Sequence, residues 1–227
     1  MNPVIIALDV ESATEARRIV NTLGDSVSFY KVGLELYASA GMDFVRELKH
    51  QGHRVFLDLK LYDIGETVKR AVAQVSKSGA DFLTIHAMRQ VMQAAVAGRG
   101  DSALKLLGVS VLTSVDDRDL AEDGYTCRVP ELVERRVRNA MADGVDGIVC
   151  SPVEVGKVRA IANRAILVTP GVRSAGASAA DQKRVATPAE AIANGADYLV
   201  IGRQVTRAGD PRGEVQRILD EIAVRSI

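Results

Sequence analysis

Short runs of apolar, often β-branched residues alternate along the whole chain with longer stretches in which apolar positions recur every three or four residues. The short runs are typical of buried strands, and the longer stretches are typical of amphipathic helices. In residues 12–23, the apolar side chains of Ala16, Ile19, Val20 and Leu23 share one helical face. The pattern predicts strands at residues 4–10, 28–34, 54–60, 82–87, 104–112, 147–151, 165–172 and 198–205.

Residues that favour helix starts and helix stops fall between the predicted strands. Ser12 and Glu15 have the spacing of a capping box, in which each side chain can accept a free amide of the first helical turn. Glycine repeatedly follows a helical stretch, where it can adopt the left-handed backbone that ends a helix. One helix–glycine–strand phrase recurs almost unchanged, as KSGAD at 77–81, ADGVD at 142–146 and ANGAD at 193–197.

Eight strand–helix units without a long linker predict one α/β domain over residues 1–227, a single (β/α)₈ TIM barrel. An open, doubly wound parallel sheet is the alternative arrangement of the same elements. That fold usually has a glycine-rich first turn, whereas the end of the first predicted strand and the residues after it here are Leu8-Asp9-Val10-Glu11-Ser12, which contain no glycine. The sequence also contains neither a GxGxxG nor a GxxxxGK[ST] motif, which favours the barrel.

Composition and charge narrow the possible partners. The 29 basic and 29 acidic residues give no formal net charge, so the chain lacks the basic surplus typical of nucleic-acid binding. No apolar run approaches the roughly 20 residues that cross a bilayer, and the N-terminus has no signal-peptide pattern. We therefore expect a cytoplasmic protein without nucleic-acid or membrane partners. Cys127 and Cys150 alone cannot form a four-thiolate zinc site.

Charged residues occur where the predicted strands end, which is where active sites lie in (β/α)₈ barrels. Asp9 lies at the end of the first strand, Lys31 lies on the second, and Asp58 and Lys60 end the third, with Asp63 in the loop beyond. Asp58 and Lys60 are two residues apart, so their side chains leave an extended strand on the same side. Charges converging from three strands are more typical of a catalytic site than of packing.

The last two strands end in residues that suit an anion. The loops after strands seven and eight bind phosphate in many barrels of this kind. Arg173 follows strand seven, and Gly202 and Arg203 fall at the expected end of strand eight. Arginine can bond a phosphate through two nitrogens, and glycine lets the backbone approach it. The small-residue segment 174–182 is predicted to be a lid over a phosphorylated substrate.

The segment 58–68, DLKLYDIGETV, resembles the D-x-K-x-x-D-I signature of the orotidine 5'-monophosphate decarboxylase family. Other segments resemble the same family in the same order: Ala-Leu-Asp at 7–9, Lys-Val-Gly at 31–33, Pro-Gly-Val-Arg at 170–173 and Gly-Arg at 202–203. The resemblance implies decarboxylation of orotidine monophosphate to UMP and CO₂ in pyrimidine biosynthesis, with no cofactor and no metal.

The resemblance also implies a role for each matching residue. Lys60 would protonate C6 of the pyrimidine, Asp58 would face the departing carboxylate, and Lys31 and Asp63 would complete the charged array. The residues implied in substrate binding are Asp9, Lys31 and Thr67 at the ribose, Thr113 near the ring, and Arg173, Gln182, Gly202 and Arg203 at the phosphate. The family is also implied to be a homodimer, with Asp63 and Thr67 contributed across the interface.

Two alternatives share much of this pattern. The keto-gulonate phosphate decarboxylases and hexulose phosphate synthases have a similar D-x-K-x-x-D motif but use Mg²⁺, held partly by a Glu on strand two. The residue there is Lys31, whose ammonium would repel a divalent cation, so the metal-free reaction is favoured. A barrel that binds a nucleotide without catalysis is the other alternative, but it would not require Asp58, Lys60 and Asp63 together.

Overall fold

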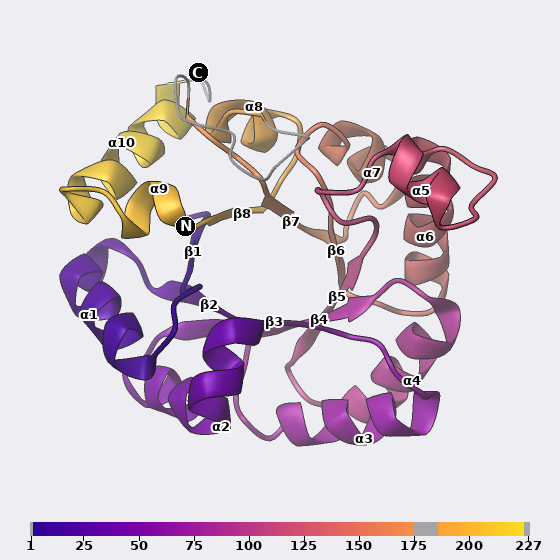
Figure 1. Ribbon diagram of the computed structural model, residues 1–227, viewed down its shortest axis with the longest axis horizontal. Helices are drawn as coiled ribbons and strands as arrows, with labels where there is room; N and C mark the ends of the chain where they lie inside the picture. The colour runs from indigo at the N-terminus through magenta and orange to yellow at the C-terminus, as the bar shows by residue number, and fades with distance from the viewer. Residues whose placement is uncertain (1, 175–185, 225–227) are drawn as a thin grey trace.

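The computed structural model describes residues 2–174 and 186–224 and contains a closed barrel of parallel strands in sequence order. Helices surround the barrel, as Figure 1 shows in a view along its axis. The prediction of a (β/α)₈ TIM barrel is therefore confirmed. The strands are β1 Val4–Ala7, β2 Phe29–Gly33, β3 Arg54–Leu61, β4 Phe82–His86, β5 Lys105–Val109, β6 Gly147–Val149, β7 Ile166–Pro170 and β8 Tyr198–Ile201.

The helices lie between the strands and extend beyond β8. They are α1 Ala13–Leu23, the 3₁₀ helix η1 Gly24–Ser26, α2 Leu34–His50, α3 Gly65–Val75, α4 Arg89–Arg99, α5 Asp117–Glu122, α6 Val129–Ala142, α7 Val155–Ile161, α8 Pro188–Ala193, α9 Arg203–Thr206 and α10 Pro211–Val224. The Ser12 hydroxyl caps α1 by accepting the amide of Glu15, which is one of the two bonds of the predicted capping box; the structure gives no return bond from the Ser12 amide to the Glu15 carboxylate among the described residues. No described helix is both long and apolar enough to cross a membrane.

The barrel closes because the first and last strands pair. Ile6 of β1 is in register with Tyr30 of β2 on one side and with Ile201 of β8 on the other. Parallel pairing places the carboxyl ends of all eight strands at one rim. The ends of strands that lie far apart in the sequence are therefore brought around a common opening.

Two apolar layers result from the alternation of side chains along the strands. One layer packs between the barrel and its helices, and the other fills the barrel itself. Three of the four phenylalanines, Phe29, Phe56 and Phe82, lie inside the barrel. Alternate residues of each strand point inward at successive heights, so Lys31, Asp58 and Lys60 lie at the carboxyl rim, whereas Arg54 begins β3 at the amino end.

The repeated helix–glycine–strand phrase has one structural role in all three copies. Its glycines, Gly79, Gly144 and Gly195, have positive φ values of 78°, 80° and 105° and end a helix or turn. Its aspartates accept a backbone amide from the preceding strand: Asp81 from Val55, Asp146 from Leu106 and Asp197 from Leu167. The phrase therefore stabilises the amino end of the barrel, opposite the rim where strands end.

Seven of the eight predicted strands run past the observed end, two of them next to the predicted site residues Thr113 and Arg203. The predicted strand at 104–112 ends at Val109, so Thr113 lies in a turn beyond the strand rather than directly at its end. The predicted strand at 198–205 ends at Ile201, and Arg203 begins the short helix α9. Apolar residues such as Val205 continue the sequence pattern because they pack inward from a helix, which periodicity over a few residues does not distinguish from a strand.

Candidate active site

A cavity of about 640 Å³ opens at the rim where the strands end. Its walls come from both halves of the chain, because all eight strands end at this rim. It contains most of the side chains that the sequence places in the site. The predicted site residues that line it are Asp9, Lys31, Asp58, Lys60, Thr113, Arg173, Gly202 and Arg203.

Four charged side chains form a continuous array along one wall of this cavity. The Lys60 ammonium donates to Oδ1 of Asp58 at 2.8 Å. On the other side of Asp58, Nζ of Lys31 lies 3.6 Å from Oδ2, and it donates to Oδ1 of Asp9 at 2.6 Å. The charges thus alternate in sign, so each group stabilises the ionised form of its neighbour.

Burial differs along the array. The Lys31 and Asp58 side chains are 7% and 15% exposed, whereas Lys60 is 30% exposed and Asp9 lies at the open end. Burial by itself would raise the pKa of the Asp58 carboxyl, but the charges of Lys31 and Lys60 and hydrogen bonds from Lys60 and Thr84 outweigh it. The pKa of Asp58 therefore lies below its ordinary value, and the carboxylate is ionised at neutral pH.

The end of β3 has an unusual backbone. Lys60 has φ of 47°, and it is the one non-glycine residue with positive φ in the described part of the chain. The register between β3 and β4 shifts between Leu57 and Leu61, so the strand bulges where Lys60 lies. At this bulge the Lys60 amide donates to the side-chain hydroxyl of Thr84, at 2.9 Å, and not to a backbone carbonyl of β4. Thr84 is a contributor to the array that sequence reasoning missed.

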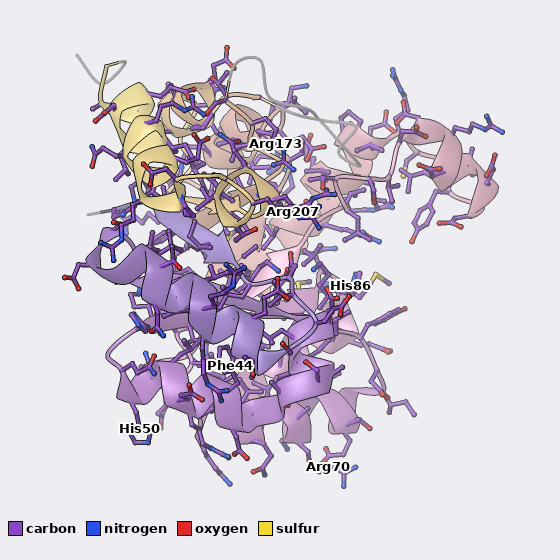
Figure 2. The ribbon with its side chains drawn as sticks, turned by 60° about the vertical axis from the view of Figure 1, so that its left-hand side comes forward. Phe44, His50, Arg70, His86, Arg173 and Arg207 are labelled. Carbon is purple, nitrogen blue, oxygen red and sulfur yellow. The ribbon has the colours of Figure 1, made fainter. Side chains whose placement is uncertain are left out.

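The opposite wall of the cavity is basic. Arg173 follows β7, Arg203 begins α9, and Arg207 follows α9, and all three line the cavity. Figure 2 shows Arg173 and Arg207 near one another on the α9 side of the molecule. Arg207 was not predicted, although its position four residues after Arg203 could have indicated it. An anionic group held here would lie across the cavity from the lysines.

Two predicted site residues that the structure describes are not in this cavity. Asp63 and Thr67 are exposed on the loop after β3 and on α3, outside the cavity. The Asp63 carboxylate accepts the amide of Ile64 at 2.6 Å and makes no ion pair with the lysines within the described residues. Gln182 and most of the predicted lid lie outside the described residues.

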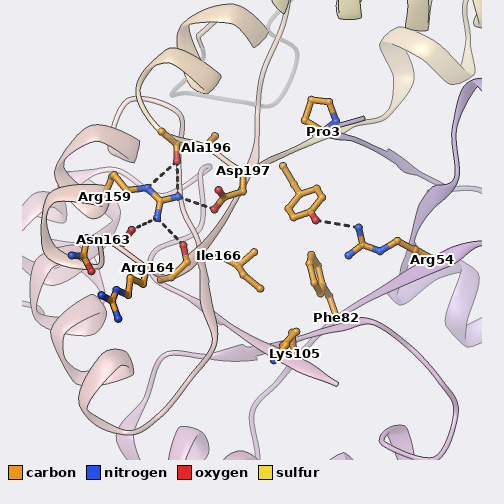
Figure 3. A pocket seen from close by; sticks show the side chains of 13 residues that line it. Pro3, Arg54, Phe82, Lys105, Arg159, Asn163, Arg164, Ile166, Ala196 and Asp197 are labelled. Carbon is orange, nitrogen blue, oxygen red and sulfur yellow. Dashed lines mark hydrogen bonds and ion pairs between the residues drawn. The ribbon is translucent and has the colours of Figure 1, made fainter. Parts of the chain in front are cut away.

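A second large hollow, of about 700 Å³, lies at the amino end of the barrel (Figure 3). Two of the cations that line it, Arg159 and Arg54, have protein partners. Arg159 donates to Asp197 and to carbonyls of neighbouring loops, and the Arg54 guanidinium lies 4.0 Å from the ring centre of Phe29 and donates to the Tyr198 hydroxyl. The contacts of these two arginines therefore stabilise the amino end of the barrel.

No group of three or more His, Cys, Asp or Glu side chains that could hold a metal gathers anywhere in ranges 2–174 and 186–224. Three carboxylates line the cavity, Asp9, Glu35 and Asp58, and two of them, Asp9 and Asp58, contact Lys31. The donor set at the rim is therefore one of alternating charges, suited to an anionic substrate with two separated polar ends.

Comparison with known proteins agrees with this site. Residues 2–218 match the family described as Orotidine 5'-phosphate decarboxylase / HUMPS family. The chain is 54% identical over 221 residues to orotidine 5'-phosphate decarboxylase of Rhodopseudomonas palustris (strain BisB5), covering 97% of this chain and 94% of that protein. It is 52% identical over 225 residues to the enzyme of the same name from Caulobacter vibrioides (strain NA1000 / CB15N), with 97% of each chain covered.

A solved structure has the same fold as this chain. The crystal structure of orotidine 5'-phosphate decarboxylase from Lactobacillus acidophilus superimposes with a TM-score of 0.86 at 36% identity, covering 98% of this chain and 99% of that one. The resemblance seen in the sequence motif therefore extends over the whole fold. This chain belongs to the orotidine 5'-phosphate decarboxylase / HUMPS family.

Proposed function

We propose that this protein decarboxylates orotidine 5'-monophosphate to UMP and CO₂ without a cofactor, and that Lys60 delivers the proton to C6. The observation that carries the proposal is the Lys60–Asp58–Lys31–Asp9 array facing three arginines across one cavity. The names of the close relatives and the family match support the same reaction. A nucleotide with a phosphate at one end and a carboxylated ring at the other fits the two walls.

The charge array suits a reaction that has no electron sink. When the C6–carboxylate bond breaks, the electron pair stays on C6 and CO₂ leaves. The Lys60 ammonium, already fixed against Asp58, would stabilise this negative charge and then transfer its proton to C6, and solvent would reprotonate the amine. A charge held in place before the reaction stabilises the transition state without a further reorganisation cost.

Asp58 has a second role in the proposal. Its carboxylate would lie near the carboxylate of the substrate, so the two negative charges would repel each other until CO₂ departs. Because the flanking ammonium groups of Lys31 and Lys60 keep the pKa of Asp58 low, protonation does not relieve this repulsion at neutral pH. Lys31 and Asp9 would also hold the ribose hydroxyls at the open end of the array.

The arginine wall would hold the phosphate. Arg173, Arg203 and the backbone at Gly202 line the same cavity as the lysines, and Thr113 lines it from the turn after β5. Binding energy from the phosphate, which does not react, can contribute to the rate by fixing the ring against Lys60. Gln182 is proposed as a further phosphate ligand on the basis of the family motif alone.

We propose further that the protein is a homodimer in which Asp63 and Thr67 enter the partner's cavity. Both are exposed and lie outside the cavity of their own chain. Large exposed apolar side chains follow the consecutive strands β2, β3, β4 and β5 on the same side of the rim, which is typical of an interaction surface. They are Leu34, Tyr62, Ile64, Met88 and Leu112.

The direct test follows the loss of orotidine monophosphate absorbance with the wild-type chain, with and without EDTA. We expect turnover that EDTA does not reduce and that falls by at least about 10³-fold in Lys60→Ala, whereas UMP still binds. Lys157→Ala, on the exposed face of α7, is the matched control. Activity that disappears with EDTA and returns with Mg²⁺ would overturn the metal-free reaction, and substantial activity in Lys60→Ala would overturn its role as proton donor.

A further inference from the structure

Thr84 lies on β4 directly beside the Asp58–Lys60 pair. Its side chain is fully buried, and its hydroxyl makes two hydrogen bonds, both to β3. It donates to Oδ1 of Asp58 at 3.0 Å and accepts the backbone amide of Lys60 at 2.9 Å. One hydroxyl therefore connects the carboxylate of the array to the backbone that carries its exposed ammonium.

The hydrogen bond from the Lys60 amide to the Thr84 hydroxyl is made at a strained backbone position. A non-glycine residue in the left-handed region costs on the order of 1–2 kcal/mol, so surrounding contacts must hold Lys60 at φ of 47°. The shifted register removes the usual ladder partner from this part of β3, and Thr84 supplies an acceptor in its place. Because the side-chain direction of Lys60 depends on this backbone, Thr84 also fixes where the ammonium points.

In the hydrogen bond between Thr84 and Asp58, the Thr84 hydroxyl must be the donor. The hydroxyl has a single proton, and it accepts from the Lys60 amide, so this proton can go only to Asp58. An ionised carboxylate accepts it at Oδ1, the same oxygen that receives the Lys60 ammonium at 2.8 Å. Both hydrogen bonds are stronger when Asp58 is ionised, because a charged acceptor strengthens them.

We propose that Thr84 is a positioning residue for the decarboxylation, which holds the Lys60 ammonium and the Asp58 carboxylate in their reactive arrangement through its hydroxyl. The inference rests on the proposed function. Valine has nearly the same shape and suits a buried strand, so packing alone would not require a hydroxyl here. A fully buried hydroxyl without partners would be costly, whereas this one has two.

The test compares Thr84→Val, which removes the hydroxyl, with Thr84→Ser, which keeps it. We expect kcat of Thr84→Val to fall about 10–100-fold while KM changes less than about threefold, because the array is disturbed and the phosphate and ribose contacts remain. Thr84→Ser should recover kcat to within about threefold of wild type. Thr169→Val is the matched control, since Thr169 is a fully buried barrel threonine whose hydroxyl has no hydrogen-bond partner within the described residues.

A pH profile separates positioning from a merely structural role. Loss of a hydrogen bond to the ionised form raises a carboxyl pKa, so the acid limb of kcat/KM should move to higher pH in Thr84→Val but not in Thr84→Ser. Circular dichroism and UMP binding by calorimetry would establish that each variant is folded. Should Thr84→Val not fold, Thr84→Ala measured against Thr84→Ser carries the same comparison.

The outcomes are distinct. Wild-type kcat in Thr84→Val, equal losses in the serine and valine variants, or a loss confined to KM would each overturn the positioning role. If the acid limb of kcat/KM lies at the same pH in wild type and in Thr84→Val, the Thr84 hydroxyl does not stabilise the ionised Asp58 carboxylate, and that part of the proposal is wrong. If the wild-type chain itself does not decarboxylate orotidine monophosphate, the proposed function fails; if it does and Thr84→Val is equally active, only the inference about Thr84 fails.

Discussion

The ammonium of Lys60 donates to the carboxylate of Asp58 at 2.8 Å, although a single residue separates them on β3. Neighbouring inward positions of a regular strand are about 7 Å apart, so long side chains can meet there only if they bend together or the strand deforms. Here the strand bulges, with Lys60 in the left-handed region. The pair is therefore a product of local backbone geometry as well as of opposite charge.

Replacement of Asp58 tests the carboxylate within this pair. Asp58→Asn keeps the size of the side chain but removes the charge between Lys31 and Lys60, so kcat should fall by about 10²-fold or more. Binding of UMP should be unchanged or tighter, because the array becomes more positive toward an anion. Steady-state kinetics and calorimetry measure both, with Asp101→Asn in an exposed turn as control. A loss of kcat below about tenfold would argue against the role of this charge.

Mixed dimers test whether sites are shared. Lys60→Ala and Asp63→Ala chains should each be inactive alone, but a mixed dimer would have one site with Lys60 from one chain and Asp63 from the other. Random reassembly of equal amounts should restore about a quarter of wild-type activity, since half of the dimers are mixed and each has one intact site. Mass spectrometry would verify the mixed dimers. No recovery in verified mixtures would show that Asp63 does not cross the interface.

Gly33 leaves space for the open end of the array. A Cβ there would lie 2.7 Å from Oδ1 of Asp9 and 2.9 Å from Nζ of Lys31. Both atoms end flexible side chains, so Gly33→Ala should fold with nearly wild-type stability while displacing the pair. We expect kcat/KM to fall on the order of 10²-fold, because small displacements of positioned groups are costly to catalysis. Unchanged kinetics would show that the Asp9–Lys31 contact is dispensable.

Gly98 lies where α4 approaches α3. A Cβ there would lie 2.2 Å from the Lys69 carbonyl oxygen, and neither backbone can move away cheaply. Gly98→Ala should therefore reduce the free energy of unfolding by about 1–3 kcal/mol, although alanine is the better helix former. Gly156→Ala in α7 meets open space and should be neutral or stabilising by up to about 1 kcal/mol. Denaturant unfolding of the two variants should give opposite signs, and equal effects would contradict the steric argument.

His86 makes stability depend on pH. Burial, and then the charges of Arg136 and Lys60, lower the pKa of His86 below its ordinary value. Below about pH 6.5 the unfolded chain therefore binds a proton that the folded chain does not, so stability falls as the pH drops through this window. His86→Gln should show a smaller difference in Tm between pH 7.5 and pH 5.5 than wild type. The difference should not vanish, because burial also lowers the pKa of His53. An equal or larger difference would contradict this account.

Much of the fold was predictable because it depends on local pattern. The alternation of apolar runs gave the strand count and order, and the closed barrel confirms them. The predicted helix cap at Ser12 and the glycine stops of the repeated phrase are also found in the structure, because short-range sterics and hydrogen bonds decide them. Strand ends were less predictable, as Arg203 shows, because a few apolar residues suit a strand and a short helix equally.

The sequence by itself determined which chemical groups this protein has and at which rim they gather, because side-chain alternation and parallel order follow from the chain alone. Only the tertiary structure decided which groups meet. Lys31 reaches both Asp9 and Asp58 because barrel closure fixes the register of three strands. Thr84 joins the site through a hydrogen bond to Asp58, 26 residues away in the sequence, and Arg207 lines the cavity whereas Asp63 does not. No local periodicity encodes these positions.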